Sequence, residues 1–190
     1  MSIEEFVSTY EGARDAGIRV QLVDGMVIQT SPPTGEHGRC QNYLSTELTS
    51  RFGKKPRGPD SPGGWWILTE AGVRYPPATV FCHDLAGWRR ERVEKCPKGV
   101  PIHDRPDWVC EVLSSNRKTD LVRKKDVLHE WKVPHYWVVD PEDDTLFVFE
   151  WADKGYINVA SVDTTQKGRF PPFDAIELSV AELLGVEDDE

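Results

Sequence analysis

A strand–helix–strand pattern over residues 107–140 constrains the fold of this chain more than any other feature. Residues 107–113, DWVCEVL, are mostly apolar and are followed by the turn cluster 114–116, which is typical of a buried strand. In residues 119–131, apolar positions recur three and four apart, which predicts an amphipathic helix. The apolar segment that ends at Asp140 predicts a second strand. Such a unit indicates an α/β fold with helices packed on a sheet.

Glu111 is a charged residue in the middle of the first strand of this unit. Strand side chains alternate between two faces, so Glu111 shares its face with Val109 and Leu113. A carboxylate between apolar neighbours has to be paired, bound to a metal or neutralised. Glu111 therefore needs a specific partner.

Lys124 is a second charged residue at an apolar position. Thr119 is the expected N-cap of the helix, and Asp120 suits the positive end of the helix dipole. Lys124 falls at the centre of the apolar side, which comprises Leu121, Val127, Leu128 and Trp131. Two interpretations are open. Lys124 forms an ordinary i,i+4 pair with Asp120, with its stem along apolar surface, or it is directed at a site in the core.

Length and composition limit the classes of protein to which this chain can belong. The chain has 190 residues, of which 38% are hydrophobic and 29% charged, and we expect a single domain over residues 1–190. No apolar run approaches the roughly 20 residues of a membrane helix, and the acidic N-terminal segment is unlike a signal peptide. The four cysteines lack C-x-x-C spacing, which favours reduced thiols in a cytoplasmic protein. We expect the acidic tail 187–190 to lie outside the packed fold.

The net charge of −9 counts against a protein that coats nucleic acid electrostatically, because phosphate binding depends on Lys and Arg. The net charge does not exclude a local basic surface that binds nucleic acid. One basic stretch lies within residues 89–98 and another within residues 54–57. On charge pattern alone, each is more often a solvated loop than a binding surface.

Periodicity and turn residues divide the rest of the chain into further elements. The sequence Asp24-Gly25 between two short apolar runs is a strong signal for an N-terminal hairpin. Helices are expected at 3–16, at 36–52 and in a short piece before residue 184. Further strands are expected at 20–23, 26–29, 65–68, 72–75, 80–86, 145–151 and 156–162.

Asp84 is a second acidic residue inside an apolar strand. Alternation places it on the same face as Val80, Cys82 and Ala86. One or two carboxylates suffice to hold Mg²⁺ against a phosphate, so Asp84 and Glu111 are candidate metal ligands. A backbone carbonyl near Val112 is a candidate third ligand.

With a lysine nearby, this pair of acids suits phosphodiester hydrolysis. The metal would polarise the phosphate and lower the pKa of a bound water. Lys124 would orient that water and offset the developing charge. The three residues are therefore a candidate catalytic set.

On these residues the chain resembles the Uma-type restriction endonuclease family, within the PD-(D/E)XK nuclease superfamily. The matching segments are HDLAGWRRERV at 83–93, DWVCEVLSS at 107–115 and DLVRKKDVLHEWKVPHYWVVDP at 120–141, with TSPPTGEH at 30–37 and VDG at 23–25. The match runs from about residue 19 to residue 160. It implies a restriction-endonuclease-like core, with a central mixed sheet flanked by helices and extended by the N-terminal hairpin.

The resemblance also implies roles for individual residues. Asp84 occupies the aspartate of the PD element, and Glu111 occupies the second acidic position. Leu113 stands where the superfamily usually has lysine, and Lys124 matches the position from which this family supplies it. His83 replaces the proline of the PD element, a change that we expect to affect the turn more than the chemistry. Gln21 stands where relatives often have glutamate, and the metal site here is weaker if that glutamate shares in metal binding.

Other candidates are weaker. His37 at the start of a helix could approach the site and touch phosphate, although a polar residue is common at such a position. Gln21 and Asp120 are further accessory candidates. A zinc site is conceivable from four residues, but their spacing matches no closed structural motif. These four are Cys82, His83, Cys96 and His103.

The sequence therefore predicts a metal-dependent endonuclease that hydrolyses DNA phosphodiester bonds. Asp84 and Glu111 would bind Mg²⁺, for which Mn²⁺ can substitute, and Lys124 would complete the catalytic set. The alternative is a non-catalytic module that binds nucleic acid or protein and retains the nuclease fold. Because cutting a duplex takes two sites, a nuclease of this kind is expected to be a homodimer.

Overall fold

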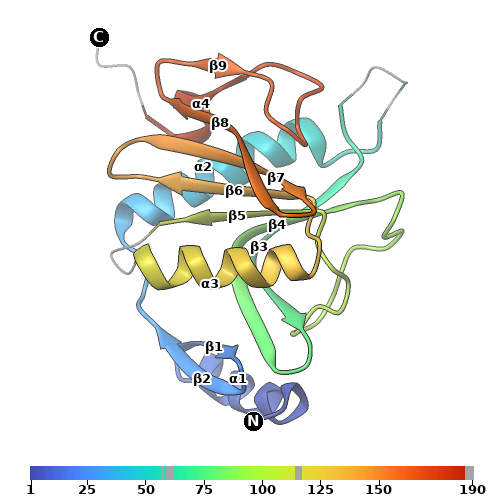
Figure 1. Cartoon of the computed structure of the whole chain (residues 1–190), viewed down its shortest axis with the longest axis vertical. Coiled ribbons are helices and arrows are strands. Elements are labelled where there is room, and N and C mark those ends of the chain that lie inside the picture. The colour runs from blue at the N-terminus through green and yellow to red at the C-terminus, as the bar shows by residue number, and fades with distance from the viewer. Residues whose placement is uncertain (57, 59–61, 114–116, 187–190) are drawn as a thin grey trace.

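A large mixed sheet forms the centre of the computed structural model, which describes residues 1–56, 58, 62–113 and 117–186 (Figure 1). The helices are α1 (Ile3–Asp15), α2 (Gly35–Phe52), α3 (Arg117–Glu130) and α4 (Val180–Leu184). The strands are β1 (Arg19–Val23), β2 (Met26–Thr30), β3 (Trp65–Tyr75), β4 (Thr79–Arg89), β5 (Trp108–Val112), β6 (His135–Asp140), β7 (Thr145–Ala152), β8 (Gly155–Asp163), β9 (Lys167–Gly168) and β10 (Leu178–Ser179).

The main sheet has the strand order β2-β1-β4-β5-β6-β7-β8, and β3 pairs with β4. Strands β5 and β6 run parallel, and the other pairs in this sheet are antiparallel within the described residues. Parallel neighbours need a crossover connection, which α3 provides. The predicted mixed sheet and the strand–helix–strand unit are confirmed.

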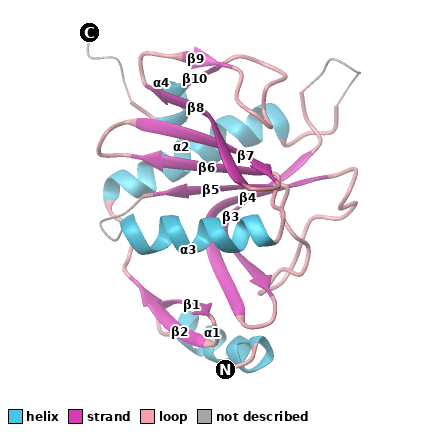
Figure 2. Ribbon diagram, viewed as in Figure 1, coloured by secondary structure: helices cyan, strands magenta, loops and turns pink. Residues whose placement is uncertain are grey.

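Helices α2 and α3 cover opposite faces of the sheet (Figures 1 and 2). On one face, Leu44 and Leu48 of α2 pack in the same buried cluster as Trp108 and Cys110. On the other face, Leu128 of α3 packs with the buried side chains of the second cluster, which include Val109, Tyr136 and Val138. The alternation predicted for the first strand is therefore correct, because its even and odd positions enter different cores.

The N-terminal hairpin is confirmed, and its turn chemistry explains it. Asp24 and Gly25 both have positive φ, at 49° and 78°, which is the requirement of the two-residue turns that suit hairpin twist. Strand β1 also pairs with β4 through Leu22 and Val80. This contact attaches the hairpin to the main sheet near the start of β4.

The alternation of side chains reverses halfway along the β3–β4 pair. Phe81 and Ala86 lie in the same core cluster, although they are five positions apart and would face opposite ways in a regular strand. The reversal occurs where Glu70 faces Asp84, since the ladder pairs Thr69 with Leu85 and then Ala71 with His83. Glu70 has a φ of 51°, in the left-handed region that distorts a strand.

This distortion corrects two expectations. Residues 65–75 form one bent strand rather than two separate strands. The prediction that Val80, Cys82, Asp84 and Ala86 share one face is wrong from Asp84 onward, because the strand turns over between His83 and Asp84. The bend lies at the candidate site.

Smaller differences concern the ends of elements. Helix α3 begins at Arg117, so Thr119 lies within the helix and is not its N-cap. Arginine and lysine favour helix, which is consistent with the two extra residues at this end. The turn cluster 114–116 and the tail 187–190 lie outside the described residues. Among the helices that the structure describes, none has the length and apolar character to cross a membrane.

Candidate active site

A pocket of about 290 Å³ opens where the bend in β3 and β4 meets the N-terminal hairpin. One wall comes from α1, β1 and residues 30–33, and the other comes from β4, β5 and α3. Its polar lining includes Gln21, His37, Glu70, Asp84, Glu111 and Lys124. The three residues of the predicted catalytic set therefore lie in one pocket, together with the accessory candidates Gln21 and His37.

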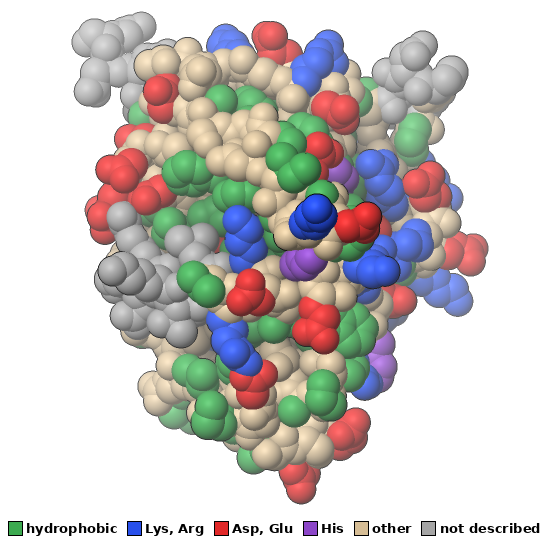
Figure 3. All heavy atoms as spheres, viewed as in Figure 1, with side chains coloured by type: hydrophobic (Ala, Val, Ile, Leu, Met, Phe, Trp, Pro, Cys, Tyr) green, Lys and Arg blue, Asp and Glu red, His purple; other side chains and the backbone are tan. Residues whose placement is uncertain are grey.

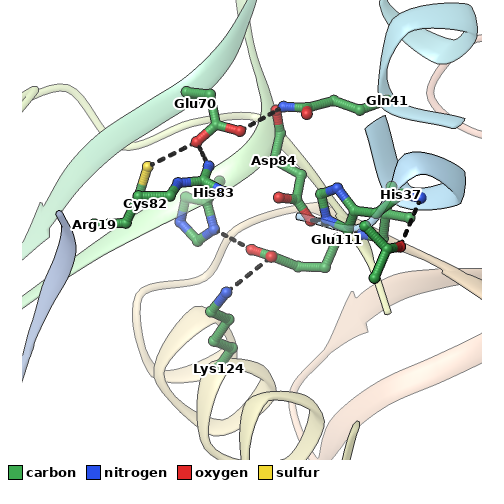
Figure 4. Close-up of polar contacts among 11 residues, drawn as sticks. Arg19, His37, Gln41, Glu70, Cys82, His83, Asp84, Glu111 and Lys124 are labelled. Atoms are coloured by element: carbon green, nitrogen blue, oxygen red, sulfur yellow. Dashed lines mark hydrogen bonds and ion pairs between the residues drawn. The ribbon is translucent and has the colours of Figure 1, made fainter. Parts of the chain in front are cut away.

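Glu111 and Lys124 form a buried ion pair. The ammonium of Lys124 is 2.8 Å from Oε2 of Glu111, and the two residues are 4% and 6% exposed. Lys124 points from α3 toward the sheet, as Figure 4 shows. The side chain of Asp120 is outside the described part of the structure, so the proposed Asp120–Lys124 pair stays untested. The contact with Glu111 supplies the specific partner that both charges needed.

His83 binds the other oxygen of the same carboxylate. Its Nδ1 lies 2.5 Å from Oε1 of Glu111, and its Nε2 lies 2.7 Å from the hydroxyl of Tyr75. The expectation that His83 chiefly affects the turn is incomplete, because its side chain contacts Glu111, a residue of the predicted catalytic set. The reversal at Asp84 is the reason, since it lets the adjacent residues 83 and 84 both face Glu111.

The environment of Glu111 favours its ionised form. Burial by itself would raise the pKa of this carboxyl group. The charge of Lys124 and the contact with His83 outweigh that effect and lower the pKa below its usual value of 4.5. Glu111 is therefore a carboxylate throughout the neutral pH range.

Asp84 is held between β5 and α2. Its Oδ2 accepts a hydrogen bond of 2.8 Å from the backbone N–H of Val112 and lies 3.2 Å from Nε2 of His37. His37 is in the first turn of α2, where Thr34 caps the helix by accepting a hydrogen bond from the His37 backbone N–H. The register of β4 and β5 pairs Leu85 with Cys110, so the next position sets Asp84 opposite Glu111. Three elements thus fix the Asp84 side chain.

Glu70 is an acidic residue of the pocket that the sequence pattern did not indicate. It accepts a hydrogen bond from Nε2 of Gln41 at 2.8 Å, and the same nitrogen lies 3.0 Å from the Asp84 carbonyl oxygen. Arg19 of β1 forms an ion pair with the Glu70 carboxylate. The β3–β4 register places Glu70 opposite Asp84, and a hairpin centred near Pro77 would have given this pairing from the sequence.

The zinc hypothesis is not supported. Among residues 1–56, 58, 62–113 and 117–186, no three or more His, Cys, Asp or Glu side chains gather as a metal-binding group. Cys82 lies beside Glu70 in the pocket, while His103 contacts Arg74. Burial raises the pKa of the Cys82 thiol to about 11, so the thiol is protonated at neutral pH.

The remaining donor set suits a hard cation such as Mg²⁺. Mg²⁺ usually retains several waters and takes only one or two protein carboxylates, so a larger cluster is not required. Oδ1 of Asp84 has no hydrogen-bond partner among the described residues, and Asp84, Glu111 and Val112 line the same pocket. The oxygens of Glu111 are both engaged, but each carboxylate oxygen has two lone pairs and can accept a second contact.

The central mixed sheet, its two covering helices and the hairpin extension define a restriction-endonuclease-like fold. The model of the Uma2 family, described as "Putative restriction endonuclease", matches residues 3–181, and the chain belongs to this family. A crystal structure described as "a putative nuclease belonging to DUF820" from Anabaena variabilis has a TM-score of 0.71 at 17% identity, over 97% of this chain and 98% of that chain. No curated protein matches the chain. The predicted family and fold are confirmed.

Proposed function

We propose that this protein is a metal-dependent endonuclease that hydrolyses DNA phosphodiester bonds. The observation that carries the proposal is the convergence of Asp84, Glu111 and Lys124 in one pocket, from two strands and a helix. Family membership supports the same class of activity. Within this proposal, the protein acts in the cytoplasm.

The residues divide the chemistry between them. Asp84 and Glu111 would hold Mg²⁺ or Mn²⁺, which supplies Lewis-acid polarisation of the phosphate when bound. Lys124 places a positive charge beside Glu111, where it offsets negative charge that develops on the phosphate and orients a water. His37 holds Asp84 from the side of α2 and is close enough to the pocket to contact a phosphate oxygen.

Nicking of supercoiled plasmid tests the proposal. The purified chain should convert supercoiled plasmid to the open-circular form with Mg²⁺ or Mn²⁺, and EDTA should stop the reaction. Metal affinity measured by calorimetry without DNA separates binding from chemistry. A chain that binds neither metal and leaves plasmid, linear duplex and single-stranded DNA intact contradicts the proposal.

A non-catalytic binding module is the second candidate, and two observations favour it. Gln21 lines the pocket without a carboxylate, and both oxygens of Glu111 already have protein partners. A module of this kind would bind DNA or a protein without cutting, and its affinity would be the same after Asp84→Ala. The plasmid assay distinguishes the two candidates, since only the nuclease requires Asp84.

The basic stretch within residues 89–98 gives limited support to a separate DNA surface. Figure 3 shows Lys and Arg side chains gathered on one flank, with acidic side chains among them. Arg92 binds Asp107 at 2.8 Å, and Arg90 lies over the Trp66 ring at 3.5 Å. These arginines have structural partners, so the proposed DNA contacts centre on the pocket. Arg57, in the second stretch, lies outside the described residues.

We further propose that the active form is a homodimer. One pocket cuts one strand, and two copies related by two-fold symmetry would present a pocket to each strand of a duplex. Light scattering at micromolar concentration should give twice the chain mass. A monomer at that concentration, with and without DNA and metal, contradicts the dimer and leaves single-strand nicking as the expected activity.

A further inference from the structure

His83 is a residue of the site whose role follows from contacts rather than from motif. Its side chain is completely buried, at 0% exposure. Both ring nitrogens are engaged, Nδ1 with Glu111 at 2.5 Å and Nε2 with the Tyr75 hydroxyl at 2.7 Å. Figure 4 shows His83 and Lys124 each directed at the Glu111 carboxylate, from β4 and from α3. A carboxylate contacted from two sides has little freedom to rotate.

The contact with Glu111 decides where His83 carries a hydrogen. An ionised carboxylate only accepts hydrogen bonds, so Nδ1 of His83 carries the hydrogen and donates to Glu111. Nε2 shares a hydrogen bond with the Tyr75 hydroxyl, which can donate or accept. Tyr75 therefore holds the ring in the orientation that donates to Glu111, and the chain of hydrogen bonds runs from β3 through β4 to β5.

Aromatic packing fixes the positions of the two side chains. Tyr75 is 1% exposed and meets the His83 ring edge-on, with centroids 5.8 Å apart and planes at 82°. Phe81 packs against the same imidazole at 6.0 Å, and Trp131, just beyond α3, packs against Tyr75 at 6.0 Å. The ring thus has a single place in the core, and its hydrogen bond to Glu111 has a single direction.

We propose that His83, oriented by Tyr75, is a positioning residue that fixes the Glu111 carboxylate for metal binding. This inference rests on the proposed function, because it requires Glu111 to be a metal ligand. Carboxylates that bind metals are commonly held by hydrogen bonds from a further layer of residues, which orient them. The proline of the PD element has no hydrogen-bonding side chain, so this chain holds its carboxylate by a contact that such a proline cannot make.

The test measures Mn²⁺ affinity by calorimetry, without DNA, on two variants of the same residue. His83→Leu removes both hydrogen bonds and should weaken Mn²⁺ binding by about 10–100-fold, the usual effect of losing such a partner. His83→Asn retains an N–H donor near the position of Nδ1 and should bind Mn²⁺ almost as tightly as wild type. A packing role alone would not rescue affinity in His83→Asn, because asparagine fills the aromatic pocket no better than leucine.

Tyr75→Phe supplies a variant that keeps the packing and removes only the hydroxyl. It should weaken Mn²⁺ binding measurably, though less than His83→Leu, since the imidazole remains. Tyr156→Phe is the matched control, because the Tyr156 hydroxyl also makes one hydrogen bond, of 2.6 Å to the Val133 carbonyl, and does not line the pocket. Thermal unfolding of each variant shows that it is folded.

The outcomes separate this inference from the proposed function. If wild type binds no Mn²⁺, both are overturned. If wild type binds Mn²⁺ and Asp84→Ala does not, but His83→Leu binds as tightly as wild type, only the role of His83 is overturned. Should His83→Leu fail to fold, Tyr75→Phe decides: affinity equal to that of Tyr156→Phe contradicts the inference, and weaker affinity supports it.

Discussion

Asp84→Ala is expected to abolish both Mg²⁺ binding and strand cleavage. Loss of a hard oxygen ligand weakens Mg²⁺ binding directly, and the Oδ1 atom of Asp84 has no competing protein partner among the described residues. We expect cleavage to fall by at least about 10³-fold, the upper end of the loss found for one electrostatic group. Plasmid nicking and calorimetry with Mg²⁺ and Mn²⁺ measure the two effects.

Asp84 also has a structural role, and the choice of variants has to separate this role from the proposed metal binding. Its Oδ2 accepts the backbone N–H of Val112, and leaving such a buried donor unpaired costs about 1–3 kcal/mol. Asp84→Asn keeps an acceptor for that N–H while removing the charge, so it should remain closer to wild-type stability. It should still lose metal affinity and cleavage.

Asp107 provides a matched control for these variants. It is 5% exposed, accepts a hydrogen bond of 2.8 Å from the backbone N–H of Arg89, and does not line the pocket. Asp107→Asn also loses the charge that Arg92 contacts, so its stability should fall at least as far as that of Asp84→Asn, without a change in metal affinity or cleavage. Equal loss of cleavage in both variants would indicate that Asp84 acts through folding, and would contradict its role as a ligand.

The parts of the fold that local signals determine could be predicted from the sequence. Asp24 and Gly25 adopt the positive φ values that their turn requires, and the alternation around Glu111 places opposite faces of β5 in different cores. The same local logic placed Lys124 on the buried side of α3, where it is 4% exposed. These features depend on a few neighbouring residues, which is why pattern alone was sufficient.

The parts of the site that depend on distant contacts could not be predicted in this way. The reversal at Asp84 arises from the positive φ of Glu70 on the neighbouring strand, and positive φ at a glutamate has no sequence signal. Regular alternation sets the neighbours His83 and Asp84 on opposite faces, so it gave no sign that His83 contacts Glu111 beside Asp84. Residue types and spacing predicted two acids and a lysine that line one pocket, but the hydrogen-bond partners of these residues required the fold.

Lys124→Met is expected to reduce cleavage by roughly 10²–10³-fold, the loss typical of one electrostatic group. Methionine is close to lysine in length and apolar, so it can occupy the buried position between α3 and the sheet. The ammonium is 2.8 Å from Oε2 of Glu111, and Leu113 carries no charge that could replace it. Removing one partner of a buried pair can cost about 3–5 kcal/mol, so unfolding is measured alongside cleavage.

Metal affinity distinguishes the role of Lys124 from that of the acids. Lysine is not a ligand, and at pH 8 the variant should bind Mg²⁺ at least as tightly as wild type, because a competing cation has left Glu111. The pH dependence should change, however. Lys124 helps to hold the pKa of Glu111 below 4.5, and without it the opposing effect of burial raises that pKa. Metal binding needs the ionised carboxylate, so affinity in the variant should fall at a higher pH as acid is added.

Lys125→Met is the control for the lysine. Lys125 belongs to the same helix, but its ammonium lies 3.9 Å from the centre of the Phe149 ring and it does not line the pocket. This variant should cut plasmid at the wild-type rate and bind Mg²⁺ with the wild-type pH dependence. If Lys124→Met also cuts at the wild-type rate, the protein can still be a nuclease, but its catalytic cation is a different residue, and Arg19 at the rim of the pocket is the next to replace.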